Sequence, residues 1–278
     1  MIVTSKIKRI TRRKLVVARG VQPPRKIRLA IQAMLQKGLV EMAADYEKLA
    51  GELALLAPKE AIKQLRQKWR GFYEGQSVAL AEGWVDAIVD QSKEQFKLSV
   101  SRAVGIDVTA ILDGESVRSA GESMATDAAQ LIRTIPENYL DQVQEAVWMH
   151  YQQFPQPEGR TLLEQIRHIG KVSENRAKLI ARDQTSKINI AVLQARNEEA
   201  GIKEYIWRTA RDGRVVGNPS GLYPKAVMPD VHGNHYAREG KKFRWDSPPE
   251  DSHPGYAINC RCTAEPVIDM NNLQIVFG

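Results

Sequence analysis

Hydrophobic residues recur every three or four positions from about residue 27 to residue 150, which is the spacing of one apolar face of an α-helix. Polar and charged residues fill the positions between them. The pattern predicts long antiparallel helices joined by short polar links, with the apolar face packed as core. In the first of these helices the apolar stripe consists of Leu29, Met34, Leu35, Leu39, Met42, Tyr46, Leu49, Leu53 and Leu56.

Proline and glycine mark where the helices are expected to begin, bend and end. Pro58 suits the first turn of a second helix, where a missing backbone N–H breaks no hydrogen bond. Gly71, Gly75 and Gly83 are expected to break or bend that helix. Pro136 is expected to end a third helix, because proline removes an intrahelical hydrogen bond, and a fourth helix is expected to follow it.

The stretch PQPEGR at residues 155–160 breaks the helical composition and is interpreted as a domain boundary. After it, Thr161 can cap a helix, with Glu164 in the reciprocal position of a capping box. Ser173 can cap a following helix that ends near Gly201. The predicted organisation is a basic N-terminal arm (residues 1–26), a helical domain (residues 27–154) and a C-terminal domain (residues 155–278).

The C-terminal domain is predicted to combine short strands with a long polar loop. Residues 202–210 alternate β-forming side chains and are predicted as a strand, followed by a hairpin turn at Asp212. Residues 217–256 are dense in Gly, Pro, Asn, Asp and His, and a loop of that length in a compact domain needs something to hold it. Residues 264–268 and 272–277 are predicted as closing strands. The predicted fold class is therefore α+β, with a mostly helical N-terminal domain followed by a smaller α+β C-terminal domain that carries a loop-rich His/Cys segment.

Positive charge is concentrated at the N-terminus, although the whole chain carries a formal charge of +7. The first 40 residues hold eleven Lys and Arg and no acidic residue. Such an arm is attracted to a polyanion, because each cation pairs with a phosphate and releases counterions. An acidic protein surface and a solvated tail without a fixed partner are the alternatives. The candidate contact residues are Lys6, Lys8, Arg9, Arg12, Arg13, Lys14 and Arg19.

The overall composition limits the classes of protein to which the chain can belong. Hydrophobic residues make up 43% of the chain, which is enough for an ordinary globular core. The sequence contains neither an apolar run long enough to cross a bilayer nor the pattern of a secretory signal. Two cysteines do not form a disulfide framework, so a reducing, cytosolic origin is expected.

Both cysteines of the chain lie in the stretch HPGYAINCRC at residues 253–262. Three of the chain's five histidines, His232, His235 and His253, lie within the 30 residues before the cysteines. A disulfide between Cys260 and Cys262 would be strained, because it closes a very small ring. Two thiolates and two imidazoles instead form a tetrahedral set that zinc prefers, and such a site would hold the long loop. The predicted ligands of a structural zinc are His235, His253, Cys260 and Cys262, with His232 as the alternative to His235.

Three other interpretations of these residues stay open. Both cysteines can be small buried hydrophobic residues, with His253 as a hydrogen-bonded turn residue before Pro254. A cysteine–histidine nucleophile would need a third group to orient the imidazole, and the sequence marks none. A catalytic metal would need a nearby acid or base, for which Glu250 and Asp251 are the nearest acids.

Taken in order, the segment NRAKLIARD, the stretch from Gly201 to Arg214 and the stretch HPGYAINCRC resemble the phage head morphogenesis family, the phage Mu F-like minor head proteins. The resemblance covers roughly residues 160–268. The residue after IAR, often Thr in that family, is Asp183 here. The matching positions are Arg182, Gly201, Tyr205, Trp207, Asp212, Arg214, His253, Pro254, Asn259, Cys260, Arg261 and Cys262.

The resemblance implies a minor capsid protein of a tailed phage or prophage that enters the procapsid in few copies and supports assembly or DNA delivery. The implied partners are the portal protein, the major capsid or scaffold protein and packaged double-stranded DNA, without a membrane. The implied location is the virion, and the host cytoplasm during assembly. No catalytic mechanism comes with the family, so the chain is expected not to be an enzyme. The alternative is a metal-dependent nuclease or hydrolase that acts on phage DNA through the His/Cys segment.

Several residues of the resemblance are expected to have structural roles. Asp212 is expected to begin a turn and to cap its backbone. One residue of the pair Tyr205 and Trp207 is expected in the core, and the other on the helical part. Arg261 is expected to point away from the face of the two cysteines. The motif residues predicted to be structural are Arg182, Trp207, Asp212, Asn259 and Arg261.

Overall fold

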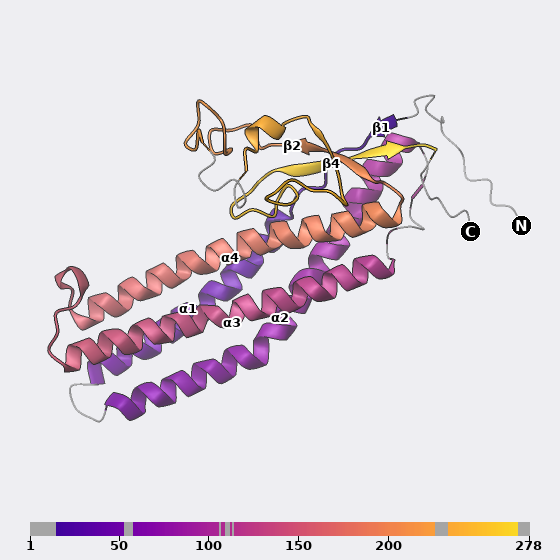
Figure 1. Cartoon of the computed structure of the whole chain (residues 1–278). Helices are drawn as coiled ribbons and strands as arrows, with labels where there is room; N and C mark the ends of the chain where they lie inside the picture. Colours follow the sequence, from indigo (N-terminus) through magenta and orange to yellow (C-terminus); the bar gives the residue numbers. More distant parts are fainter. Residues whose placement is uncertain are drawn as a thin grey trace, which may run out of the picture. The chain divides into compact units, whose positions relative to one another are not determined.

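The computed structural model of the chain describes residues 15–52, 58–105, 107, 108, 112, 114–225 and 233–271. Helices make up most of this part (Figure 1), and a small sheet accompanies them, so the predicted α+β class is confirmed. None of the helices in this part is long and apolar enough to cross a membrane. The helices are α1 (Arg25–Glu52), α2 (Pro58–Val104), α3 (Glu115–Tyr151), η2 (Pro157–Gly159), α4 (Leu162–Glu199) and η3 (Tyr236–Arg238).

The strands form one antiparallel sheet in the order β1-β4-β2-β3. In the central pair, Tyr205 lies opposite Pro266 and Trp207 lies opposite Ala264. Two predicted strands are confirmed, those at residues 202–210 and 264–268, and the one predicted at residues 272–277 lies outside the described residues. The strands are β1 (Leu15–Val17), β2 (Glu204–Arg208), β3 (Lys242–Arg244) and β4 (Thr263–Asp269).

The hairpin predicted at Asp212 is wrong, because β2 does not pair with the segment that follows the turn. Its partners are β4 and β3, which begin far downstream at Thr263 and Lys242. The turn itself is present, since the Asp212 carboxylate accepts a hydrogen bond from the Arg214 backbone N–H at 2.9 Å. An Asp-Gly pair therefore reverses the chain here without joining adjacent strands.

The chain forms two compact units, and neither is a continuous stretch of sequence. Unit 1 contains the sheet and the loops that follow β2, and unit 2 is helical. Helices α2, α3 and α4 each contribute residues to both units. The predicted domain boundary at residues 155–160 falls inside unit 2 and stays a prediction. Unit 1 consists of residues 1–24, 85–124 and 183–278, and unit 2 of residues 25–84 and 125–182.

The core of unit 2 follows the apolar stripe of α1. Leu35, Leu39 and Met42 are buried, and the ring of buried Tyr46 packs edge-on against Tyr139 of α3, with 5.8 Å between ring centroids. Leu29 and Met34, also assigned to the stripe, are exposed. Met34 is one position from Leu35, and one helical residue turns the side chain by roughly 100°, away from the buried face. Position on the helical wheel therefore outweighs hydrophobicity.

Helix α3 runs through Pro136, so the prediction that this proline ends a helix is wrong. Ile135 and Tyr139 on either side of it are fully buried, and their packing favours a continuous helix. Side chains also bond to carbonyls near the proline: the Thr134 hydroxyl donates to the Leu131 carbonyl at 2.7 Å, and the Asn138 amide donates to the Thr134 carbonyl at 2.6 Å. Burial and local hydrogen bonds offset the bond that proline removes.

Two other predicted helix interruptions are absent. Helix α2 is not broken at Gly71, Gly75 or Gly83, because burial of Trp69 and Trp84 stabilises it on either side; a bend at these glycines stays a prediction. Helix α4 begins at Leu162 and is one helix to Glu199, so Ser173 caps nothing and is buried.

The predicted capping box at the start of α4 is present. The Thr161 backbone N–H donates to the Glu164 carboxylate at 2.8 Å, and the Glu164 N–H donates to the Thr161 hydroxyl at 3.3 Å. Helix α2 likewise begins at Pro58, as predicted.

Unit 1 has a core in which the sheet packs on helical segments. Tyr205, Trp207 and Ala264 of the sheet belong to one buried cluster with Phe96 of α2 and Leu193 of α4. The chain before α1 joins the same core through Ala18 and Val21. It lies so close to β4 that a side chain at Gly20 would come within 2.7 Å of the Ala264 carbonyl oxygen. The segment from Leu15 onward is therefore built into unit 1.

Candidate metal centre

The loop that follows β2 and the segment that precedes β4 bring together residues that are far apart in sequence. After β2 the chain makes a series of turns, and His235 begins the short helix η3. Cys260 and Cys262 lie in the segment that enters β4. Because β4 pairs with β2, this segment lies near the loop that follows β2. Sheet pairing thus places the two cysteines close to His235.

His235, Cys260 and Cys262, hereafter the His/Cys cluster, have the geometry of a metal site. The His235 Nδ1 atom lies 3.5 Å from Cys260 Sγ and 3.6 Å from Cys262 Sγ. All three ligand atoms lie within 4.8 Å of one another, and each side chain is largely buried. This group could hold a metal ion. Among the residues that the structure describes, no other group of three or more His, Cys, Asp or Glu residues has this geometry.

A buried carboxylate orients the imidazole of the cluster. The Asp251 Oδ2 atom lies 2.7 Å from His235 Nε2 and also accepts the Gly233 backbone N–H at 2.8 Å. Arg238 holds the other oxygen of Asp251 through a hydrogen-bonded ion pair. With Nε2 occupied by Asp251, Nδ1 is the atom that faces the sulfurs. This is the arrangement in which an outer carboxylate fixes the ring of a metal-binding histidine.

The charges at the cluster depend on its neighbours. Burial lowers the pKa of His235, but the bonds to Asp251 and Cys260 outweigh burial and raise the pKa to about 9. Burial raises the pKa of Asp251, but His235, Arg238 and the Gly233 N–H together lower it to about 2. The hydrogen bond from Cys262 lowers the pKa of Cys260, and the same bond together with burial raises the pKa of Cys262. Without metal the cluster thus favours a Cys260 thiolate beside an imidazolium.

Backbone donors also prepare Cys260 for negative charge. Its sulfur accepts the Gly255 N–H at 3.3 Å and the Cys262 N–H at 3.4 Å. Metal ligation requires deprotonated thiols and a neutral imidazole, so binding would release protons from His235 and Cys262.

Aromatic side chains form the floor beneath the cluster. The Trp207 ring packs edge-on against His235, with 5.1 Å between centroids, and the Arg238 guanidinium lies 4.9 Å from the Trp207 centroid. Tyr205 and Trp207 are both fully buried. The expectation that only one of them is in the core is wrong, because residues two apart in a strand share a face.

His253 lies beside this floor and not among the three grouped ligand atoms. Its Nδ1 is 3.1 Å from the Tyr205 hydroxyl, and its ring lies 5.1 Å from that of Trp245. Burial lowers the pKa of His253 to about 4, so the ring is neutral at pH 7. Of the predicted zinc ligands, the structure brings His235, Cys260 and Cys262 together; His232 lies outside the described residues.

Three further motif residues, Asp212, Arg261 and Asn259, form contacts within unit 1. The Arg261 guanidinium donates two hydrogen bonds to the Asp212 carboxylate, one of them at 2.6 Å, which lowers the pKa of Asp212 to about 2. The Asn259 backbone N–H donates to Asp183 of α4 at 3.3 Å, with Asn259 itself at a positive φ of 62°. Arg182 is half-buried on α4. Of these motif residues, Asp212 and Arg261 thus contact each other directly.

A pocket of about 320 Å³ borders the His/Cys cluster, and all three cluster residues line it. Its wall also contains three cationic side chains, Arg214, Lys225 and Arg261, and the phenol of Tyr223. No carboxylate is among the described residues that line it. We call this the cation-lined pocket.

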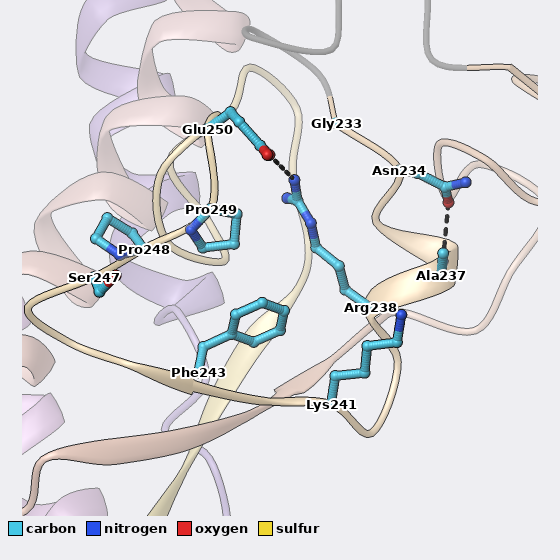
Figure 2. A pocket seen from close by; sticks show the side chains of 10 residues that line it. All are labelled: Gly233, Asn234, Ala237, Arg238, Lys241, Phe243, Ser247, Pro248, Pro249 and Glu250. Atoms are coloured by element: carbon cyan, nitrogen blue, oxygen red, sulfur yellow. Dashed lines mark hydrogen bonds and ion pairs between the residues drawn. The ribbon is translucent and has the colours of Figure 1, made fainter.

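A second pocket, of about 810 Å³, borders Arg238 (Figure 2). In Figure 2 the Arg238 side chain points toward Glu250, whose carboxylate lies 3.3 Å from the guanidinium. A Cβ atom at Gly233 would come within 2.3 Å of the Arg238 guanidinium and 3.0 Å of the Asp251 carboxylate, so a larger residue here would displace these side chains.

Of the predicted contact residues in the N-terminal arm, Arg19 is the one that the structure describes. Its side chain is exposed, and its carbonyl accepts the Ser99 hydroxyl at 2.6 Å. The other six, Lys6, Lys8, Arg9, Arg12, Arg13 and Lys14, lie outside the described residues.

Sequence reasoning missed the roles of Asp251, Arg238 and Gly233. From the sequence alone, Asp251 is only an acid that lies two residues before His253. Its partner His235 is sixteen positions upstream. No periodicity links positions that meet only through loop folding.

Comparison with known proteins gives one informative match. The chain is 34% identical over 223 residues to an uncharacterized protein of Haemophilus influenzae, and the match covers 80% of this chain. The chain spans about half the length of that relative, since the match covers 46% of it. No family model matches the chain, and no solved structure does.

Proposed function

We propose that the chain is a minor head morphogenesis protein of a tailed phage or prophage, and that a structural zinc at the His/Cys cluster holds its loop-rich module in shape. The observation that carries the proposal is the pairwise contact of the motif residues. Tyr205 bonds to His253, and Asp212 pairs with Arg261. A linear motif whose members meet in space behaves as one structural unit, which supports the resemblance on which the assembly role rests.

Zinc fits the donor set of the cluster. Two thiolates and one imidazole are ligands that zinc binds in proteins, and Asp251 supplies the outer carboxylate that orients such an imidazole. When bound, the ion would join the loop at His235 to the segment that enters β4. The chain's own residues prepare the site, because Asp251 orients His235 and backbone N–H groups face the Cys260 sulfur.

The assembly role is tested in the replicon that encodes the protein. Particles and procapsids from an induced lysogen are separated by density and probed for the chain. We expect the chain in few copies per head, and an in-frame deletion should lower the yield of DNA-filled heads. Its absence from procapsids and particles, together with an unchanged yield of filled heads, would rule the proposal out.

The metal is tested separately on purified protein. We expect about one zinc per chain by elemental analysis, and little in Cys260→Ser or Cys262→Ser. Asp251→Asn should retain the site but weaken zinc affinity by roughly 10–100-fold, the usual effect of losing an outer-shell partner. His168→Ala, on α4 and outside the cluster, is the matched control and should keep full zinc content.

A metal-dependent hydrolase acting on phage DNA is a second candidate, favoured by the position of the cluster beside the cation-lined pocket. Incubation of the zinc-loaded chain with plasmid DNA tests it. If the zinc is only structural, the native chain and Cys260→Ser should cleave plasmid DNA to the same extent. Cleavage that the native chain supports and Cys260→Ser loses would favour the hydrolase.

A further inference from the structure

The His/Cys cluster supplies three ligand atoms from the described residues, whereas a closed structural zinc site has four. The three residues all line the cation-lined pocket. Trp207 and Asp251 contact His235, Arg238 holds Asp251, and none of these three lines the pocket. The fourth coordination position of a bound ion therefore faces the pocket.

Charge in the pocket favours an anion at that position. Zinc with two thiolates and a neutral imidazole carries no net charge. The net charge of the pocket is therefore set by its arginine and lysine side chains. Arg261 is neutralised by Asp212. In the part of the chain that the structure describes, the Arg214 and Lys225 side chains form no hydrogen bond or ion pair, and both are exposed. With Arg214, Lys225 and Arg261 set against the single Asp212 carboxylate, the pocket offers about two net positive charges.

A phosphate monoester matches these features. Its charge near pH 7 is about −1.5 to −2, which balances two cations. Arginine and lysine are common phosphate ligands, and arginine can donate two parallel hydrogen bonds. The Tyr223 hydroxyl adds a donor, and Val215 and Ile258 give the pocket an apolar wall for the rest of a ligand. A volume of about 320 Å³ is within the range of small-ligand sites.

We propose that the metal of the His/Cys cluster keeps an open coordination position, and that this position binds a terminal phosphate group with the help of Arg214 and Lys225. This inference rests on the metal centre of the proposed function. The phosphate can belong to free inorganic phosphate, a nucleotide or a 5′-phosphorylated DNA end, and these sources share the same recognition chemistry.

Cobalt provides a spectroscopic test, because Co²⁺ absorption reports both thiolate ligation and the ligand at the fourth position. The full chain is loaded with Co²⁺ and titrated in three arms with inorganic phosphate, a nucleoside monophosphate and a 5′-phosphorylated oligonucleotide, the last against its dephosphorylated form. We expect saturable changes in the d–d bands with phosphate-bearing probes. The arm that binds most tightly identifies the source.

The variants separate the pocket from the metal. Arg214→Gln should weaken phosphate binding about tenfold, the effect of losing one charge-assisted hydrogen bond, while cobalt loading is unchanged. Arg214→Lys should restore part of the affinity. The exposed Arg118→Gln on α3 is the matched control and should bind as the native chain does.

Three results would overturn the proposal or its basis. Cobalt bound through thiolates with no spectral response to any phosphate probe would refute the open position and leave the structural metal intact. A spectrum altered by His232→Ala before any anion is added would assign the fourth ligand to that histidine and refute the open position as well. No thiolate-to-cobalt band at all would instead remove the metal centre of the proposed function.

Discussion

The helical unit 2 and the loop-rich part of unit 1 are stabilised in different ways. In unit 2, long helices bury apolar side chains such as Leu39, Met42 and Tyr139. Between β2 and β4 of unit 1, regular structure is short, and polar side chains join loops that are distant in sequence. Asp251 with His235 and Arg238, and Glu239 with Thr209, are examples.

This difference predicts different responses to mutation. Apolar packing is distributed over many contacts, so a lost side chain costs free energy in proportion to the cavity it leaves. A buried polar network concentrates its effect in a few groups, because removal of one partner leaves another charge buried and unpaired. Substitutions of Asp251, Leu39 and Glu239 test that contrast.

Asp251→Asn should give the largest loss. The carboxylate is fully buried and accepts from Arg238, His235 and Gly233, so an amide leaves the Arg238 charge without its buried carboxylate partner. We expect a loss of about 3–5 kcal/mol in the free energy of unfolding of metal-free protein, the usual cost of breaking a buried ion pair. Urea denaturation in chelator measures it, and hydrogen exchange should place the loss in residues 233–262.

The adjacent acid is the matched control for this substitution. Glu250 also contacts Arg238, but its side chain is 80% exposed. Glu250→Gln should therefore lower the free energy of unfolding by less than about 1 kcal/mol, as is usual for surface ion pairs. Equal losses for the two variants would contradict the claim that burial of Asp251 sets the effect.

Leu39→Ala tests the helical side of the comparison. Leu39 is 1% exposed in the core of unit 2, and we expect a loss of about 2–5 kcal/mol from the cavity that alanine leaves. The loss should be the same with and without chelator, because unit 2 contains none of the cluster residues. Val40→Ala, next along α1 and 55% exposed, should change stability by less than about 0.5 kcal/mol. A chelator-dependent loss in Leu39→Ala would contradict the distinction.

The two regions also differ in how far the sequence predicts them. The apolar period identified the helical region, because the period reports the buried face directly. The expectation that proline ends a helix failed at Pro136, where packing on both sides of the residue overrides local propensity. Strands β2 and β4 were predicted from their β-forming residues, whereas β1 and β3 have three residues each and give no clear pattern.

At the candidate site, the types of residue were predictable but their partners were not. The pairing of Cys260 and Cys262 with a histidine followed from residue chemistry, and the structure places His235 there. Asp251 and Arg238 could not be identified, because their positions depend on how the loops fold. His253, although it adjoins the cysteine segment in sequence, bonds to Tyr205.

Glu239→Gln tests the polar network away from the His/Cys cluster, and it should have the smallest effect of the three. The Glu239 carboxylate accepts the Thr209 N–H at 2.6 Å, the Thr209 hydroxyl at 2.8 Å and an Arg211 N–H at 2.9 Å. Burial raises the pKa of Glu239, but these bonds outweigh burial and lower the pKa to about 2. We expect the uncharged glutamine to lower the free energy of unfolding by about 2 kcal/mol at pH 7, the scale of a charge-assisted hydrogen bond.

The pH dependence of that loss follows from the direction of the pKa shift. Because folding lowers the pKa of Glu239 from its ordinary value of 4.5, the charged group stabilises the fold fully above about pH 4.5 and loses this effect as the pH falls toward 2. The difference in unfolding free energy between the native chain and Glu239→Gln should therefore be constant from pH 7 to 5 and shrink below that. Glu94→Gln, at an exposed position on α2, controls for the loss of a surface charge. A difference that stays constant down to pH 2.5 would mean that neutral hydrogen bonds, and not the carboxylate charge, hold this loop.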